Sequence, residues 1–477
     1  MENNETNIES ITASDSNQAE NPNRAENPNR AENPNRAENP KKGFDFSSLV
    51  NQAQNVSAAI LDNAQKAGKV ASDTASQAVN VANDLYDNRP KPDIPDDTTY
   101  RDVNGHYLLP DPILDEKELA KIPALAKQYQ DMTKPKGLAK IGKSIGEIIP
   151  QSAKDMAKEM GDNLADQQVY KRALEVIASS FKMIEEQASR MTISPESVIH
   201  NLNENLKDGE ISKIKEIPLL RSYEVAQVVD EQKKYYLSSA AVEGAAIGMV
   251  GFAGIPFSLV LSTFLYYRAV QSIALYYGYD VKSDPAELII ASEVFMGAMS
   301  LGSNVSNGKA DIVKKIMLIA ELQGMQQTVK KSWAEMARRG GLALLAVQIR
   351  ALANKSAQKA LNQAGRKSLE KHAFHRVFEQ LGKKLTQKNL GRVIPVVGGV
   401  AGAAFDTQIM NQIVTYANMF YHKRFIAEKE LRLQALVEGV SVDEVTGASY
   451  EEVLNSLDED PEDVFEMADI EDDMESE

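Results

Sequence analysis

Residues Gly137 to Ser144 match the spacing of a P-loop, the glycine-rich loop that holds nucleotide phosphates. In that motif Lys143 would reach a phosphate and the Ser144 hydroxyl would bind Mg²⁺. The overlapping Gly-x-Ser-x-Gly pattern would make Ser144 a nucleophile. Both motifs require a buried strand before the loop and a long helix after it, whereas Pro135 precedes this match and Pro150 soon follows. The surrounding sequence therefore argues against nucleotide binding and against a serine nucleophile.

Glu243 and Asp406 are the carboxylates inside or beside two glycine-rich apolar segments. Burial among apolar side chains raises the pKa of a carboxyl group and is typical of catalytic acids and bases. These two residues are therefore the candidates for catalysis by a hydrolase-type enzyme. The alternative is that each lies at a helix end, where its charge reaches water or a backbone N–H group.

His372, His375 and Glu379 are spaced three and four residues apart, so they share one helical face and match a set of ligands for Zn²⁺ or Fe²⁺. The pattern is not His-Glu-x-x-His, and the neighbouring Lys371 and Arg376 disfavour a bound cation. We therefore predict no metal and no cofactor. The chain has no cysteine, which excludes a cysteine nucleophile, a disulfide and thiolate metal ligands.

The main element that would position such groups is Gly244 to Tyr267, 24 consecutive residues without a charge. A straight helix of this length would be roughly 36 Å long, enough to cross a bilayer. Pro256 interrupts it, because the residue before a proline avoids the helical conformation. We expect two helices, Leu237 to Gly254 and Phe257 to Tyr277, in a hairpin that is buried in the protein or enters a bilayer without crossing it. Its glycines favour close helix packing: they are Gly244, Gly248, Gly251 and Gly254.

A second apolar patch, Val393 to Phe405, contains Gly398, Gly399 and Gly402. With the first patch it resembles the EcsC family. The matching pieces, spread over roughly residues 165–430, are Ala245 to Pro256, Arg268 to Asp280, Asp284-Pro-Ala-Glu287, Ile394 to Gly402, and Ala417 with Arg424-Phe425.

This resemblance implies an α-helical domain and a loose link to the membrane, since the family is named for a protein encoded beside an ABC transporter. A membrane transporter component is accordingly a candidate partner. The family has no established reaction or cofactor to carry over. Asp406 departs from the family pattern, where we expect Asn, so an amide role at this position does not carry over either.

Charge is unevenly distributed along the chain. The formal net charge of −15 arises beyond Arg432, where 17 acidic residues follow and no basic one does. Lys309 to Arg392, the basic block, contains 18 basic and 5 acidic residues. We expect it to contact anionic lipid headgroups, or the acidic tail folded back on it; a solvated face is the alternative. Nucleic acid is disfavoured, because few aromatic side chains are available to stack on bases. The candidate residues for the anionic surface are Lys314, Lys315, Lys330, Lys331, Arg338, Arg339, Lys383 and Lys384.

The remaining pattern predicts one all-α, multi-helix domain flanked by disordered tails. Smaller signals are a helix start at Thr192 to Glu196 and a helix end at Gly278. The expected segments are a disordered Asn-Pro repeat tail at 1–42, a weakly amphipathic helix at 43–88, a linker at 89–133, a helical domain at 134–430 with its core at about 165–430, and an acidic tail at 431–477.

These features favour a protein that acts at the cytoplasmic face of a membrane or on lipid, in a non-enzymatic or regulatory role. A hydrolase using Glu243 or Asp406 is one alternative, and a soluble interaction scaffold is another. No secretory signal begins the sequence, so we expect a cytoplasmic protein that is peripheral on the inner face of the cell membrane.

Overall fold

The computed structural model describes residues 92–133, 194–206, 208–248, 255–301, 309–320, 342–364, 373–374, 377–378 and 399–446. Every regular element within these residues is helical, which confirms the all-α prediction; an isolated bridge pairs Arg101 with Tyr107. The elements are α3 (Glu116–Thr133), α7 (Pro195–Asn205), the 3₁₀ helix η2 (Ile214–Leu219), α8 (Ser222–Gly248), α9 (Ile255–Tyr276), α10 (Pro285–Met299), α11 (Lys309–Leu318), α13 (Leu342–Ala364), α16 (Gly399–Glu438) and α17 (Val442–Thr446).

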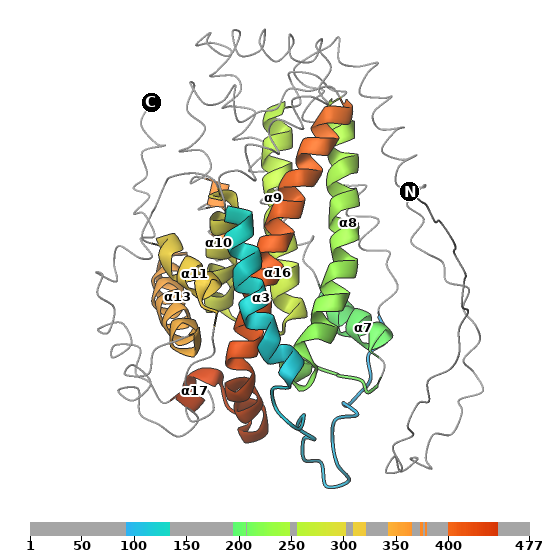
Figure 1. Cartoon of the computed structure of the whole chain (residues 1–477), viewed down its shortest axis with the longest axis vertical. Helices are drawn as coiled ribbons and strands as arrows, with labels where there is room; N and C mark the ends of the chain where they lie inside the picture. The colour runs from blue at the N-terminus through green and yellow to red at the C-terminus, as the bar shows by residue number, and fades with distance from the viewer. Residues whose placement is uncertain are drawn as a thin grey trace, which may run out of the picture. The chain divides into compact units, whose positions relative to one another are not determined.

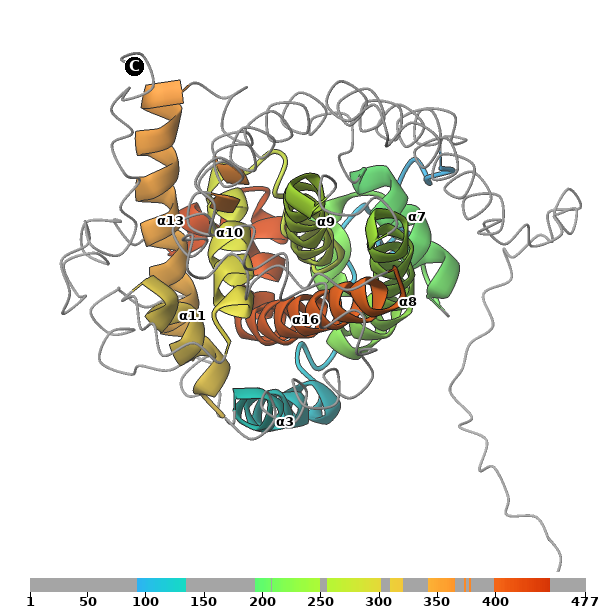
Figure 2. The ribbon, with the colours of Figure 1, turned by 90° about the horizontal axis from the view of Figure 1, so that it is seen from above.

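The 40-residue helix α16 is central to the core. It lies between α3 on one side and α8, α9 and α10 on the other, as Figures 1 and 2 show. Eleven consecutive residues, Met419 to Lys429, are buried, so neighbouring helices cover α16 on all sides at this level. A helix that is buried all round cannot show the one-sided apolar stripe of a surface helix.

The charge-free run forms parts of two helices, as predicted. Helix α8 reaches Gly248, and α9 begins at Ile255 with Pro256 in its first turn, where a missing N–H costs no helical hydrogen bond. The two helices are antiparallel and in contact (Figure 1). From Val260 on, the run is protein core: Val260, Phe264 and Tyr267 are buried, and the centroid of the Tyr267 ring lies 5.8 Å from that of Phe295.

The predicted start of α7 is confirmed. The Ser194 side chain accepts a hydrogen bond from the Ser197 backbone N–H, and Pro195 opens the helix. This arrangement satisfies a backbone donor that the first turn of a helix leaves free.

Two predicted boundaries differ from the structure. Helix α3 lies in the range predicted as a linker, and its residues Ile122, Leu125 and Tyr129 are buried against the core. Pro123 inside this helix concealed the helical pattern. Helix α16 also extends past the predicted start of the acidic tail, because Leu433 and Leu436 pack against Leu219.

The described part of the chain contains no helix with both the length and the apolar character that a membrane crossing requires.

Candidate functional site

The candidate site is a cluster of charged side chains where α9, α10, α13, α16 and α17 meet. It begins at the N-terminus of α10, where Asp284 is the N-cap and its Oδ1 accepts a hydrogen bond from the Ala286 N–H at 2.9 Å. Pro285 and Glu287 follow in the first turn, a sequence that suits a helix start because it places negative charge near free backbone N–H groups. This local rule fixes Glu287 at the centre of the cluster.

Two arginines from different helices bind the Glu287 carboxylate. Arg424 of α16 donates to both oxygens, at 2.6 and 2.8 Å, and Arg350 of α13 donates to Oε1 at 2.6 Å. Glu287 and Arg424 are both buried. Burial by itself raises the pKa of Glu287, but the Arg424 and Arg350 charges outweigh it and hold that pKa below its ordinary value. The two arginines therefore favour the ionised form of Glu287, which makes it a charged anchor and a poor proton donor.

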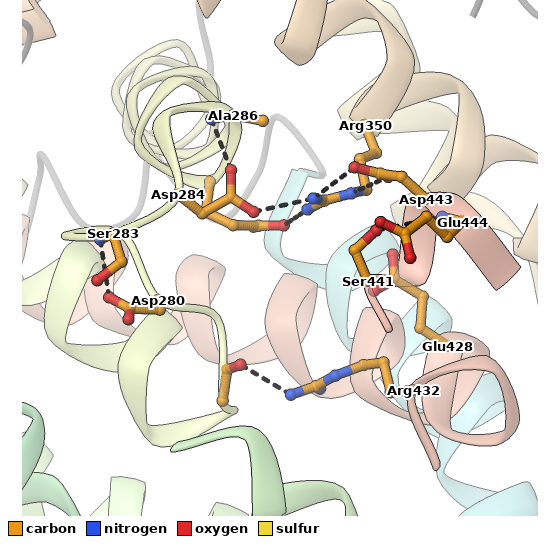
Figure 3. A network of polar contacts seen from close by, with 12 residues as sticks. Asp280, Ser283, Asp284, Ala286, Arg350, Glu428, Arg432, Ser441, Asp443 and Glu444 are labelled. Atoms are coloured by element: carbon orange, nitrogen blue, oxygen red, sulfur yellow. Dashed lines mark hydrogen bonds and ion pairs between the residues drawn. The ribbon is translucent and has the colours of Figure 1, made fainter. Parts of the chain in front are cut away.

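Arg350 joins three helices through carboxylates (Figure 3). Besides Glu287 it donates to Asp284 at 2.9 Å and to both oxygens of Asp443, at 2.5 and 3.0 Å. Asp443 belongs to α17, so this pairing attaches the short C-terminal helix to α13. Burial lowers the pKa of Arg350, but the surrounding carboxylates raise it well above its ordinary value, and the guanidinium stays charged.

A stripe on α16 completes the cluster. Arg424, Glu428 and Arg432 are four residues apart, and the Arg424 Nε donates to Glu428 Oε1 at 2.8 Å. Both guanidinium carbons of this stripe lie over the ring of Tyr279, at 4.0 and 4.4 Å from its centroid. Cations over an aromatic face are favourable, more so where water is excluded.

The end of α9 is shaped to receive Arg432. Gly278 has a φ of +80°, its N–H donates to Leu275 O, and the Tyr279 N–H donates to Ala274 O, which is the Schellman arrangement. The predicted helix end is thus confirmed. Arg432 donates to the carbonyl oxygens of Tyr277 and Gly278, at 2.9 and 2.8 Å, and satisfies groups that a helix end leaves free.

A cavity of about 280 Å³ adjoins the cluster. Its polar lining includes Lys215, Asp280, Glu428, Arg432 and Ser441. The charged groups of the cluster already bind one another, and within the described residues no group of acids or histidines is arranged to hold a metal ion. The ion pairs of the cluster therefore hold α10, α13, α16 and α17 together, and we call the cluster a clamp between these helices.

A second buried ionic contact lies on another side of α16. Glu118 of α3 accepts hydrogen bonds from Lys429 Nζ at 2.7 Å, from the Ser222 N–H at 2.8 Å and from Arg221 at 3.1 Å. Glu118 is also one half of a reciprocal cap with Asp115. Burial lowers the pKa of Lys429, and the Glu118 charge partly offsets this. This contact joins the beginnings of α3 and α8 to α16.

Lys423 caps α11 from inside the protein. Its Nζ donates to Met317 O at 2.8 Å and to Ile319 O, at the carboxyl end of that helix. Burial lowers the pKa of Lys423 to about 7. The adjacent His422 is stacked on Tyr277, and burial lowers its pKa to about 3, so it is neutral at ordinary pH.

The residues predicted from the sequence lie elsewhere. Glu243 is on α8 and Asp406 on α16, but their side chains are outside the described part, so their predicted catalytic role is untested. Lys314 and Lys315 are exposed on α11, as an anionic-surface role requires. Gly244 and Gly248 lie on α8, Pro256 on α9, and Gly399 and Gly402 on α16. Predicted residues that fall outside the described ranges are Gly137 to Ser144, Gly251, Gly254, Lys330, Lys331, Arg338, Arg339, His372, His375, Glu379, Lys383, Lys384 and Gly398.

Sequence reasoning did not identify Glu287, Arg350 or Arg424 as a connected group. A usable signal was present, since Glu287 lies in a strongly apolar helix and Arg424 in a charged stretch between apolar ones. Buried charges in such settings need partners. The two pieces of the family resemblance that contain these residues are in contact through the Arg424–Glu287 pair. They are Asp284-Pro-Ala-Glu287 and Arg424-Phe425.

In the comparison with known proteins, the model of the EcsC protein family matches residues 116–426. No curated protein matches the chain. No solved structure matches it either. The family match begins at the first residue of α3 and ends within the buried stretch of α16. It includes Glu287, Arg350 and Arg424 of the cluster, whereas Lys429 and Asp443 lie beyond it.

Proposed function

The chain belongs to the EcsC protein family, and from this premise we propose that it acts at a membrane surface or on lipid, in a non-enzymatic or regulatory role. The observation that carries this proposal is the placement of the charge-free helix ends. A regulatory connection to an ABC transporter, which the family resemblance implies, is part of the same proposal.

Three helix ends without a charge lie at one end of the bundle. They are the last turn of α8, Gly244 to Gly248; the first turns of α9, from Ile255; and the start of α16, Gly399 to Phe405. Figure 1 shows these three ends together at the top of the view. Such an end can approach hydrocarbon without moving a charge out of water.

The ionic contacts lie toward the other end of the same helices. Arg432 sits at the carboxyl end of α9, and Glu118 contacts the amino end of α8. Polarity therefore changes along the described part of the bundle, and of its two ends the glycine-rich one suits an apolar phase. This favours one orientation at a membrane.

The depth of contact is limited by the core. Because Val260 is already buried in the protein, α9 offers lipid no more than its first turn or two, about 5–10 Å of helix. That depth is typical of anchoring in the headgroup region, whereas crossing the hydrocarbon core needs about 30 Å. The proposal is accordingly a shallow anchor.

The basic block supplies a second contact, with anionic headgroups. Lys314 and Lys315 on α11 and Lys355 and Lys359 on α13 are exposed. Each basic residue near an anionic leaflet adds about 1 kcal/mol to binding. A shallow apolar anchor and a basic face together give the two signals that stable peripheral binding requires.

Site-specific fluorescence tests the proposal, because the chain has no native cysteine. Single cysteines replacing Ala246, Ser258 or Ala403 carry a polarity-sensitive dye, and Glu204→Cys on α7, whose side chain is exposed, is the matched control. The vesicles are phosphatidylcholine with about 30 % phosphatidylserine, whose anionic headgroups attract basic residues.

We expect vesicles to shift the emission of the first three dyes to the blue, and lipid-borne quenchers to quench them, while the Glu204→Cys dye stays unchanged. Far-UV circular dichroism confirms that each variant is folded. No response at any of the three positions, with the variants folded, would refute the lipid contact.

A further inference from the structure

The acidic C-terminal segment and the basic block meet at a defined point. Asp443 follows the last basic residue of the chain, and Arg350 lies inside the basic block. Their two hydrogen bonds, at 2.5 and 3.0 Å, have the paired geometry that makes arginine–carboxylate contacts specific. Ser441 accepts a hydrogen bond from the Glu444 N–H and caps the start of α17, so the contact is presented by an ordered turn.

The sequence that continues from this contact is strongly anionic. Residues 447–477 contain 14 acidic residues and no basic ones. The described residues end three positions after Asp443, which pairs with Arg350 of α13. The segment therefore starts next to the basic block and has the opposite charge.

The face beside that starting point is basic. Helix α13 contains no acidic residue, and its exposed residues Lys355 and Lys359 are one turn apart. Helix α11 packs against α13 and exposes Lys314 and Lys315. We call the exposed lysines of these two helices the α11–α13 face.

We propose that residues 447–477 bind the α11–α13 face of their own chain and thereby control its access to anionic lipid. The Arg350–Asp443 pair anchors the segment. The effect on lipid binding rests on the proposed function, because it is a regulation of the same surface; the intramolecular contact itself does not.

Distance and tethering both favour the contact. Lys355 and Lys359 lie five and nine residues beyond Arg350, which is about 7.5 and 13.5 Å along the helix. The 31 residues of the segment reach up to about 100 Å when extended. Tethering of this kind gives effective concentrations of about millimolar. The segment and an anionic bilayer would then compete for the same lysines.

The first experiment measures the contact without lipid. The full chain carries a donor and an acceptor dye at Gln358→Cys on α13 and Ser456→Cys in the acidic segment; the control pair is Glu204→Cys with Ser456→Cys. We expect higher energy transfer for the first pair than for the control, lost at about 0.5 M salt, where charges are strongly screened. Dilution with unlabelled protein should leave the transfer unchanged.

The second experiment measures vesicle binding with two full-length variants of equal net charge. One converts five acids of the C-terminal segment to amides, and the other converts five acids near the N-terminus. We expect the first to bind vesicles containing phosphatidylserine at least tenfold more tightly and the second to change little, since each lysine released near an anionic surface increases binding roughly fivefold. The substituted residues are Asp458, Glu459, Asp460, Glu462 and Asp463 in the first variant and Glu2, Glu5, Glu9, Asp15 and Glu20 in the second.

The outcomes separate the inference from the proposed function. Equal energy transfer in the two dye pairs, transfer that disappears on dilution, or equal gains in the two vesicle variants would each overturn the intramolecular contact. High transfer with no vesicle binding by any variant would leave the contact standing and overturn the membrane proposal.

Discussion

Replacing Glu287 with glutamine should destabilise the protein strongly while barely changing the shape of the side chain. The carboxylate accepts three hydrogen bonds from buried or half-buried guanidinium groups. Glutamine keeps one acceptor oxygen and turns a donor toward the arginines. One of these bonds is lost when the amide oxygen takes the place of Oε1, which accepts two of them, and two are lost in the other orientation. Hydrogen bonds to charged groups contribute about 1.5–3 kcal/mol each, and removing one member of a buried ion pair costs about 3–5 kcal/mol. We expect a loss of about 4 kcal/mol in the free energy of unfolding at pH 7.

Urea unfolding followed by far-UV circular dichroism measures this loss. The matched control is Glu204→Gln on α7, whose side chain is 64 % exposed and pairs with His200 at 3.5 Å; it should change stability by less than about 0.5 kcal/mol. Arg424→Met should also be costly, and the double variant should lose about 1–3 kcal/mol less than the sum of the two. A loss below about 1 kcal/mol for Glu287→Gln would refute the role of this carboxylate as the anchor of the clamp.

The effect should also depend on pH. The pKa of Glu287 is lowered in the folded protein, so its contribution is present above the unfolded pKa and is lost as pH falls through the folded pKa. The gap between the wild type and Glu287→Gln should therefore narrow in acid. A gap that stays constant from neutral to acid pH would contradict the assigned charge state.

Three further substitutions probe other contacts. Gly278→Ala should cost about 2–4 kcal/mol in urea unfolding, because a Cβ there combines the strain of a positive φ with a clash against the Arg432 Nη2. Gly105→Ala, at a similar φ in open space, should cost about 1–2 kcal/mol, and equal losses would contradict the packing argument. In the wild type, the free energy of unfolding should rise between about pH 7 and the ordinary lysine pKa, because in that range the Lys423 side chain is protonated in the unfolded chain and not in the folded one. Lys423→Met should remove this rise. An unchanged pH profile in urea unfolding would show that Lys423 is not the group responsible. Arg350→Lys, which loses the paired contact with Asp443, should increase the rate of amide hydrogen exchange in residues 442–446 and leave the rate in α7 unchanged. Exchange in α17 equal to that of the wild type would argue against the role of the Arg350–Asp443 pair as an anchor.

Local rules predicted much of the fold. The proline and glycines of the charge-free run placed the break between α8 and α9, and the Ser-Pro and Gly signals placed the start of α7 and the end of α9. Each of these is decided by residues close in sequence. Helix α3 was missed because Pro123 and the prolines before it read as a linker, while the packing of Ile122 and Tyr129 depends on α16.

The candidate site was beyond local rules, because its partners are distant in sequence. Arg424 and Glu287 are separated by 137 positions. From the sequence alone a charge is expected to reach water, so Arg350 was counted with the basic block, whereas the structure pairs it with Glu287, Asp284 and Asp443. A charge can be buried where a group of opposite charge lies beside it, and here the tertiary fold brings those two groups together.

The contact between Glu118 and Lys429 spans 311 positions, and this has a consequence for how the chain acquires its structure during synthesis. A ribosome adding roughly 5–20 residues per second needs about 15–60 s to cover that span. During this time the helices that will surround α16 are present without the helix they enclose, and their apolar faces are open. The domain therefore folds late in translation, with α16 as its closing piece, and loss of the C-terminal part of α16 would leave the earlier helices exposed to aggregation and to chaperones.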